Sequence, residues 1–267
     1  MDTKVPILSV KDLEVGFDLP EGRMMAVKKA SFEIFPGKTV ALVGESGSGK
    51  SVISQTIMGL LPSQAKIYGG SILFSPNSGD KPIIDIAALN PSGKPIRDIR
   101  GGQISIIFQE PMTSLSPLHT IGNQILEALM LHRRLHTNEA TQVVIDMLRL
   151  VGFPDPKRGF KTYPFELSGG LRQRSMIAMA LICRPCLLIA DEPTTALDVT
   201  IQAQILKLMK DLQAEFEMAL LMITHDLGVV ANMADDVVVM YRGEIMETGS
   251  VEDIFKRAEH PYLKSLM

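Results

Sequence analysis

A glycine-rich segment of this chain has the composition of a phosphate-binding loop. It reads Gly44-Glu45-Ser46-Gly47-Ser48-Gly49-Lys50-Ser51 and fits the pattern G-x-x-x-x-G-K-[ST]. Glycines let the backbone wrap closely around phosphate, and a following helix points its positive end at the same anion. Lys50 is expected to reach the β- and γ-phosphates of a nucleotide, and Ser51 to offer a hydroxyl to Mg²⁺. The segment predicts a nucleotide site but no particular reaction.

Two adjacent carboxylates, Asp191 and Glu192, follow the apolar run Leu187 to Ala190. Such a run is typical of a buried parallel strand, and ligands of open α/β sheets lie at the carboxyl ends of strands. Asp191 is therefore expected to hold Mg²⁺, and Glu192 to polarise an attacking water. His225 and Gln109 also follow apolar runs. For both, a contact with phosphate or metal and a purely structural role stay open.

A second predicted anion site lies at Leu167-Ser168-Gly169-Gly170-Leu171-Arg172-Gln173, which opens a long helical run. Ser168 is expected to cap that helix, and the two glycines expose its first N–H groups. One chain with one nucleotide does not need two such sites. A pair of chains does, if the second site of each covers the nucleotide of the other.

Strands that alternate with helices are expected to position these residues. The predicted strands are 7–17, 31–34, 39–43, 103–108, 187–190, 219–223 and 237–240. The predicted helices are 52–61, two within 120–152 that use Asn138 as an N-cap and Gly152 as a stop, and 200–217. The segment 75–102 is rich in Pro, Gly, Ser and Asp, which indicates a long surface excursion. The alternation predicts a parallel α/β sheet.

Composition excludes several classes of protein. The 267 residues are 46% hydrophobic and 21% charged, which is ordinary for a globular chain. A net charge of −3 argues against binding nucleic acid mainly by charge. The longest apolar run, Met176 to Cys183, is far shorter than a membrane span, which needs about 20 residues. With no apolar leader, the chain is expected to stay in the cytoplasm. Cys183 and Cys186 are expected to be small, partly buried side chains, because a zinc site needs further ligands.

These motifs, in this order, resemble the ATP-binding cassette family over about residues 6 to 267. Gly44 to Ser51, with Val52 after them, resemble the Walker A loop of that family, and Leu167 to Gln173 its signature motif. Leu171 stands where the wider family usually has Gln. The remaining motifs that resemble those of the family are the Q-loop at Gln109, Walker B at Asp191 and Glu192, the D-loop at Ala196-Leu197-Asp198, the switch histidine at His225, and an adenine-stacking ring at Phe17.

The resemblance implies a P-loop NTPase (RecA-like) α/β core with an antiparallel β subdomain and an inserted α-helical subdomain at about 112–180. It also implies a hydrolase that uses ATP and Mg²⁺, with Ser51, Gln109 and Asp191 as metal ligands. Two such subunits would meet head to tail around two ATP molecules. The partners implied are two transmembrane permease subunits, a second ATPase subunit (a copy or a paralogue) and an extracytoplasmic substrate-binding protein. The chain would then lie peripherally on the cytoplasmic face of the cell membrane.

A narrower resemblance is to the oligopeptide, dipeptide and nickel importer branch. It is carried by Phe108 to Leu118, in which Ser116 replaces the usual Asn, and by Asp191 to Gln204. His260-Pro261-Tyr262 resembles the start of the C-terminal extension of that branch. The implied boundaries are a nucleotide-binding domain at 1–257 and the extension from 258 to 267. Peptide uptake is the function implied. Nickel or oligosaccharide uptake and a cassette ATPase outside transport are the alternatives.

Three apolar residues after Gln109 are candidates for docking a permease. They are Met112, Leu115 and Leu118. Their position beside a nucleotide-sensing residue favours docking, whereas their apolar character fits packing inside the helical subdomain equally well. A charge at Leu115 is expected to uncouple ATP hydrolysis from transport if the residue docks a partner.

Overall fold

The computed structural model describes residues 5–76, 82–109, 114–195 and 197–267. The chain divides into two compact units. The first holds the residues up to 97 together with 217–267, and the second holds 98–216. Among the described residues, no helix combines the length and the apolar character needed to cross a membrane.

The first unit contains an antiparallel sheet built by the N-terminal segment. Its strands are β1 (Leu8–Leu19), β2 (Gly22–Ile34), β4 (Ala65–Phe74) and β5 (Ile84–Asp85), in the order β2-β1-β4-β5. Side chains such as Leu8, Leu13 and Val15 are fully buried. The expected strands at 7–17 and 31–34 are present, but β2 begins nine residues earlier than expected, and β4 was not predicted.

A second set of strands in the first unit carries the phosphate loop. It comprises β3 (Thr39–Val43), β8 (Ala219–Thr224), β9 (Asp236–Tyr241) and β10 (Glu244–Ser250). β3 pairs in parallel with β8 and with β9, and β10 returns antiparallel to β9. Helices of this unit are α1 (Lys50–Ile57), α9 (Leu227–Met233), α10 (Val251–Lys256) and α11 (Pro261–Leu266). The short apolar runs thus form buried parallel strands, as predicted.

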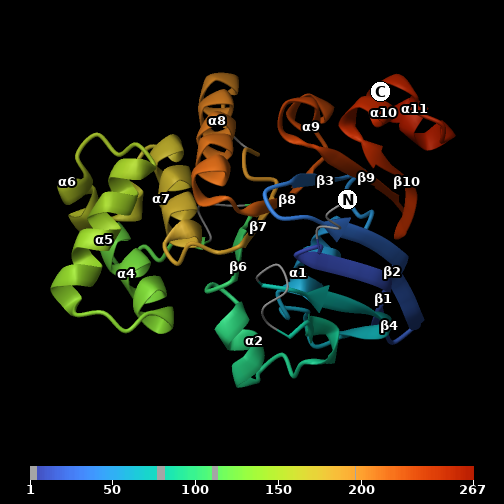
Figure 1. Cartoon of the computed structure of the whole chain (residues 1–267), viewed down its shortest axis with the longest axis horizontal. Coiled ribbons are helices and arrows are strands. Elements are labelled where there is room, and N and C mark those ends of the chain that lie inside the picture. The colour runs from blue at the N-terminus through green and yellow to red at the C-terminus, as the bar shows by residue number, and fades with distance from the viewer. Residues whose placement is uncertain (1–4, 77–81, 110–113, 196) are drawn as a thin grey trace. The chain divides into compact units, whose positions relative to one another are not determined.

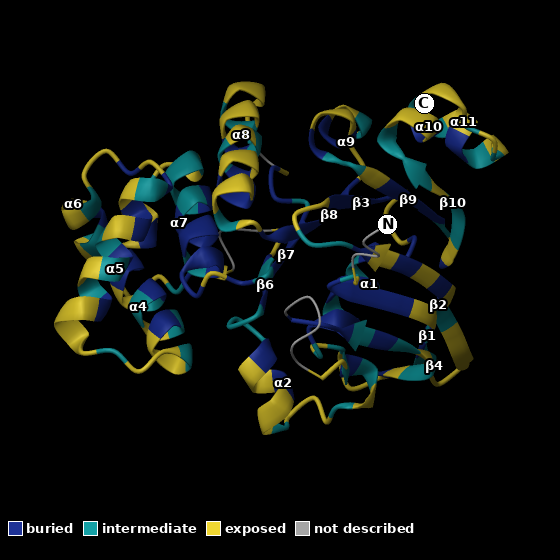
Figure 2. Cartoon of the chain, in the orientation of Figure 1, coloured by how far each residue is buried: buried dark blue, intermediate teal, exposed yellow. Residues whose placement is uncertain are grey.

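The second unit is mostly helical around a short parallel pair, β6 (Ile104–Ile107) and β7 (Leu187–Asp191). Its helices are α4 (Ile121–His132), α5 (Thr137–Leu150), α6 (Pro156–Lys161), α7 (Gly169–Leu181) and α8 (Val199–Phe216). Figure 2 shows α4 and α5 with buried residues on one side and exposed residues on the other. Four of these helices fall between 121 and 181, where the resemblance implies a helical subdomain.

Several predicted boundaries were wrong. The segment 75–102 is not a plain surface excursion, because it contains β5, a 3₁₀ turn at Ile86–Ala88 and helix α2 (Lys94–Ile99). Ile86 and Ile96 are buried there. Burial of such isoleucines lets the segment form short elements despite the Pro, Gly and Ser around them. α1 ends at Ile57 and not at 61. His136, not Asn138, is the N-cap of α5, whereas Gly152 follows α5 with a φ of 83°, as a stop residue does.

The cysteines occupy ordinary structural positions in the second unit. Both are free thiols. Cys183 is buried and donates to Ala128 O, whereas Cys186 is half-buried and donates to Gln103 O. Burial raises the pKa of the Cys183 thiol. Each thiol donates to a different backbone carbonyl. Their burial agrees with the expectation that they are small, partly buried side chains.

Candidate active site

The phosphate loop lies between buried strand β3 and helix α1 and depends on its glycines. Gly47 and Gly49 have φ values of 79° and 103°, which side chains with a Cβ rarely adopt. A Cβ at Gly44 would lie 2.2 Å from Met240 O, and one at Gly49 would lie 2.5 Å from Ala26 O. The loop therefore runs so close to β9 and β2 that only glycine fits at these two positions.

Lys50 lies in the centre of the loop and is only 5% exposed. Its Nζ donates to Gly44 O at 2.7 Å and to Glu45 O at 2.8 Å. The N-cap of α1 is Gly49, which brings no side chain to the helix N-terminus. The first N–H groups of α1 thus face the loop together with the lysine ammonium, as an anion site requires.

A tight turn supports the loop from outside. Arg242 and Gly243 join β9 to β10, and both have positive φ. The Gly243 N–H donates to Ser48 O at 3.0 Å, and the Lys28 N–H donates to Gly243 O at 2.7 Å. Backbone hydrogen bonds therefore link the phosphate loop, the β9–β10 turn and β2. Sequence reasoning missed this support, for which a two-residue turn with Gly was the available signal.

The first unit also brings His225 to the edge of the sheet that carries the loop. β3 and β8 are parallel, and Val43 is the partner of Thr224. Gly44 and His225 therefore follow neighbouring strands at the same edge. His225 is exposed, and the next residue, Asp226, caps α9 by accepting from the Gly228 N–H at 2.8 Å. This geometry favours a role at the phosphates over a purely structural one.

Phe17, the expected adenine-stacking residue, lies on β1 of the first unit. It is the partner of Met24 on β2 and of Ala65 on β4. Its ring is only partly buried. A half-exposed aromatic face is what stacking on a base requires.

In the second unit, the structure brings Glu192 and Gln109 together. β6 and β7 are parallel, with Ile107 opposite Ala190, so their carboxyl ends share an edge. Glu192 Oε2 accepts from Gln109 Nε2 at 3.0 Å and from Thr195 Oγ1 at 3.0 Å. The sequence analysis named Gln109 and Glu192 as site residues but missed Thr195.

The backbone at Glu192 is unusual. Its φ is 46°, in the left-handed region that non-glycine residues avoid. Asp191, just before it, is 8% exposed and ends β7. Non-glycine residues in this conformation cluster at functional sites, because the surrounding structure must stabilise them. The two acids thus lie at a strand end, as predicted, with Glu192 turned out of the strand.

The signature segment begins α7 as expected. Ser168 is the N-cap, and its side chain accepts from the Leu171 N–H at 3.4 Å. Gly169 and Gly170 are the first residues of the helix. Gln173, buried on the same helix, donates to Pro193 O at 2.6 Å. The signature helix is therefore tied to the segment directly after the catalytic candidate Glu192.

Other signature and D-loop residues have structural roles in the same unit. Arg172 donates through Nε to Pro164 O at 2.7 Å, and Leu167, before the helix, is half-buried. Asp198 accepts from the Ile201 N–H at 2.9 Å, just as α8 begins. Ala196 lies outside the described residues.

The candidate metal ligands are oxygen donors. Ser51 offers a hydroxyl, Asp191 a carboxylate and Gln109 an amide oxygen, and Gln109 uses its amide nitrogen toward Glu192. Oxygen ligands suit Mg²⁺, which also keeps waters and binds substrate phosphates. Within the described residues there is no cluster of three His, Cys, Asp or Glu that could hold a metal ion by itself. Each of these three groups is thus a chemically suitable ligand for Mg²⁺.

Comparison with known proteins shows the family of the chain. The family model described as ABC transporter matches residues 27–195, which include the phosphate loop, the signature segment and both acids. The chain therefore belongs to the ABC transporter family and is an ATPase of that class.

Curated relatives are similar over nearly the whole chain. The Dipeptide transport ATP-binding protein DppD of Bacillus subtilis is 52% identical over 98% of this chain and 76% of its own length. The Oligopeptide transport ATP-binding protein AmiE of Streptococcus pneumoniae is 50% identical over 98% of this chain and 71% of its own.

Solved structures show the same fold. One is a dimeric, post-hydrolysis state of an ATP-binding cassette bound to ADP and Pi, with a TM-score of 0.78, 26% identity, and coverage of 91% of this chain and 98% of that one. CbiO1 from Clostridium perfringens, part of the transporter complex CbiONQ, has a TM-score of 0.77 at 28% identity and covers 94% of this chain and 91% of its own.

Proposed function

We propose that this chain is the ATP-hydrolysing subunit of an importer for di- and oligopeptides. The observation that carries the proposal is the 52% identity with a dipeptide transport ATP-binding protein across 98% of the chain. The oligopeptide relative at 50% identity supports the same class of cargo.

We assign the following roles in hydrolysis to the site residues. Lys50 binds the β- and γ-phosphates with the N–H groups of the loop, and Phe17 stacks on adenine. Glu192 orients the attacking water, while Gln109 and Thr195 hold its carboxylate through Oε2. Catalysis of this kind is mostly positioning and charge stabilisation.

Mg²⁺, when bound, neutralises the charge that develops on the phosphate oxygens. We propose Ser51, Gln109 and Asp191 as the side chains that hold it. His225 contacts the γ-phosphate. The oxygen-only donor set supports this choice.

A second ATPase subunit completes each site. Ser168 and Gly170 of one chain cover the ATP held by Lys50 of the other, and Asp198 links the two sites. The exposed N-terminus of α7, bare of side chains at Gly169 and Gly170, supports this pairing. The dimeric, ADP-bound structural neighbour supports it as well.

Transport requires further partners. We propose two permease subunits, an extracytoplasmic peptide-binding protein, and a position on the cytoplasmic face of the membrane. The names of the relatives support a transport role, and selectivity for cargo lies with the permeases and the binding protein.

Uptake of labelled di- and oligopeptides tests the proposal. Cells that carry Glu192→Gln should lose uptake, because the neutral amide no longer polarises water; general-base catalysis contributes about 10²–10⁴-fold. The matched control is Glu215→Gln, which removes an exposed carboxylate on α8 and should leave uptake at the wild-type level. Unchanged peptide uptake with Glu192→Gln would contradict the proposal, and loss of nickel or oligosaccharide uptake instead would reassign the cargo.

A further inference from the structure

The C-terminal helix α11 is anchored in the core beneath the phosphate loop. Leu263 is fully buried in one cluster with Val43 of β3 and Val239 of β9. Figure 1 shows α10 and α11 beside β10 at the end of the chain. Because β3 leads directly into the phosphate loop, this burial places α11 at the base of that loop.

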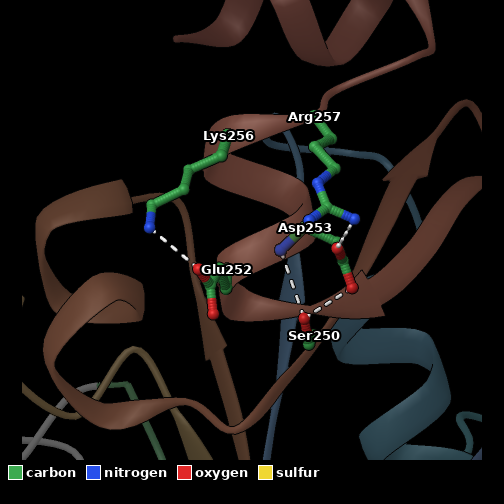
Figure 3. A network of polar contacts seen from close by, with 5 residues as sticks. All are labelled: Ser250, Glu252, Asp253, Lys256 and Arg257. Atoms are coloured by element: carbon green, nitrogen blue, oxygen red, sulfur yellow. Dashed lines mark hydrogen bonds and ion pairs between the residues drawn. The ribbon is translucent and has the colours of Figure 1, made fainter.

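Helix α10, which precedes α11, carries a network of polar contacts (Figure 3). Its N-cap Ser250 accepts from the Asp253 N–H at 3.2 Å and donates to the Asp253 carboxylate at 2.7 Å. Ion pairs Lys256–Glu252 and Arg257–Asp253 follow one turn later. These local contacts fix where the segment after α10 begins.

The turn before α11 is held just as closely. The Glu247 carboxylate of β10 accepts from the N–H groups of Glu259 and His260, the latter at 2.9 Å. The His260 imidazole then caps α11 by accepting from the Tyr262 N–H at 3.1 Å. Pro261 occupies the first helical position, where its fixed φ is favourable. His260 and Pro261 thus determine the direction of the Tyr262 side chain.

Tyr262 reaches the phosphate loop itself. Its hydroxyl oxygen accepts from the Glu45 N–H at 3.2 Å. Its ring packs on Tyr241, with centroids 4.4 Å apart. Burial raises the pKa of the Tyr262 hydroxyl, so the group is neutral near physiological pH. The contact is a neutral hydrogen bond supported by a fixed ring.

The peptide group that Tyr262 holds is the one that Lys50 uses. The Glu45 N–H and the Gly44 carbonyl belong to one planar peptide unit. Lys50 Nζ donates to that carbonyl at 2.7 Å, while Tyr262 accepts from the N–H on the opposite edge. A rotation of this peptide would break both hydrogen bonds together.

We propose that Tyr262 is a positioning residue for ATP binding: its hydroxyl holds the Gly44–Glu45 peptide in the orientation that shapes the phosphate loop and places Lys50. The three residues His260, Pro261 and Tyr262 act together in this role. His260 caps α11, Pro261 fixes its first residue, and the Tyr262 hydroxyl contacts the loop. The role requires ATP binding, which the family provides, and does not depend on the peptide cargo. Preorganisation of the loop lowers the ordering cost of binding.

Equilibrium ATP binding to the full chain tests this role. Tyr262→Phe removes the hydroxyl and keeps the ring on Tyr241. We expect the Kd for ATP to rise about threefold to tenfold, the range that one neutral hydrogen bond supplies. The KM for ATP should rise similarly, while kcat stays within about twofold, because the step affected is binding.

The matched control is Ser265→Ala, which removes another, exposed hydroxyl of α11, one that donates to Tyr262 O. It should leave the Kd for ATP unchanged. Coupling between sites is reciprocal, so ATP should slow amide hydrogen exchange in 258–267, and less so in Tyr262→Phe.

An unchanged or lower Kd in Tyr262→Phe would overturn the proposal, as would an equal rise in Ser265→Ala. A fall in kcat and thermal midpoint at constant KM would instead show a merely structural role and also overturn it. These measurements use ATP alone, so they stand whether or not the importer carries peptides.

Discussion

At the residue scale, the carboxylate of Glu192 is constrained by its backbone conformation and by its hydrogen bonds. Its backbone is left-handed, and one of its oxygens accepts two hydrogen bonds, from Gln109 and Thr195. A carboxylate held in this way has little freedom to turn, which would favour the water-orienting role that we propose for it. Hydrolysis should therefore respond to its neighbours as well as to Glu192 itself.

We expect Thr195→Val to lower kcat for ATP hydrolysis about threefold to tenfold, because one of the two hydrogen bonds that hold Glu192 is lost. The KM for ATP should stay within about twofold, since Thr195 hydrogen-bonds the carboxylate that we propose to orient water. Steady-state ATPase kinetics of the full chain check this.

Thr195→Ser keeps the hydroxyl and serves as the control. It should retain kcat near the wild-type value. If Thr195→Ser lowers kcat as much as Thr195→Val does, the methyl group and not the hydrogen bond supports Glu192, which would contradict the prediction.

At the element scale, two leucines in the segment before α4 that looked equivalent in the sequence differ in burial. Gln124 of α4 donates to Ser116 O at 3.0 Å and to His119 O at 2.9 Å, which fixes the turn. In that turn Leu115 is 4% exposed, whereas Leu118 is 81% exposed. Burial therefore favours the packing alternative for Leu115, and Met112 lies outside the described residues.

Leu115→Ala should lower the free energy of unfolding by about 2–5 kcal/mol, because it leaves a cavity among buried side chains. The matched substitution Leu118→Ala should change it by less than about 0.5 kcal/mol, as surface substitutions usually do. Urea unfolding of the full chain measures both. Equal effects at the two positions would contradict the burial difference.

This contrast also changes the docking experiment. A charge at Leu115 would destabilise the fold, so lost transport there would say nothing about docking. Leu118, exposed on a turn that Gln124 holds, is the position at which the docking hypothesis can still be tested.

At the scale of the whole molecule, stability depends on pH through the groups whose pKa folding shifts. Asp18 at the end of β1 accepts from Lys66 Nζ at 2.8 Å and from the Tyr68 hydroxyl, both on β4, and Arg23 of β2 lies 3.6 Å away. These partners, the Lys66 hydrogen bond first, lower the pKa of Asp18 from 3.8 to about 2. A carboxyl whose pKa is lower in the folded state stabilises the fold at pH values above its pKa in the unfolded chain. That stabilisation is lost as pH falls through the folded-state pKa.

Asp18→Asn should therefore be less stable than the wild type at neutral pH, and the difference should disappear as pH falls from 3.8 to about 2. Thermal unfolding of both proteins between pH 2 and pH 7 checks this. A stability difference that stays constant over the whole pH range would contradict the ionic origin of the effect.

The sequence was sufficient where one short segment carries all the information. The phosphate loop, the strands at 39–43 and 219–224, and the Ser168 cap depend on local patterns of glycine, apolar runs and a capping residue, and the structure confirms these elements. It was insufficient for 75–102, where isoleucines spaced among turn residues become buried only through distant partners.

By itself, the sequence determined the nucleotide-binding class of this protein, because spacing along the chain alone specifies the loop, the acids and the signature. Only the tertiary structure decided which residues support them. Thr195 holds Glu192, Gly243 braces Ser48, and Tyr262 reaches Glu45 from 217 residues away. The physical reason is that hydrogen bonds between distant segments depend on how strands and helices bring them together, and no local pattern records that proximity.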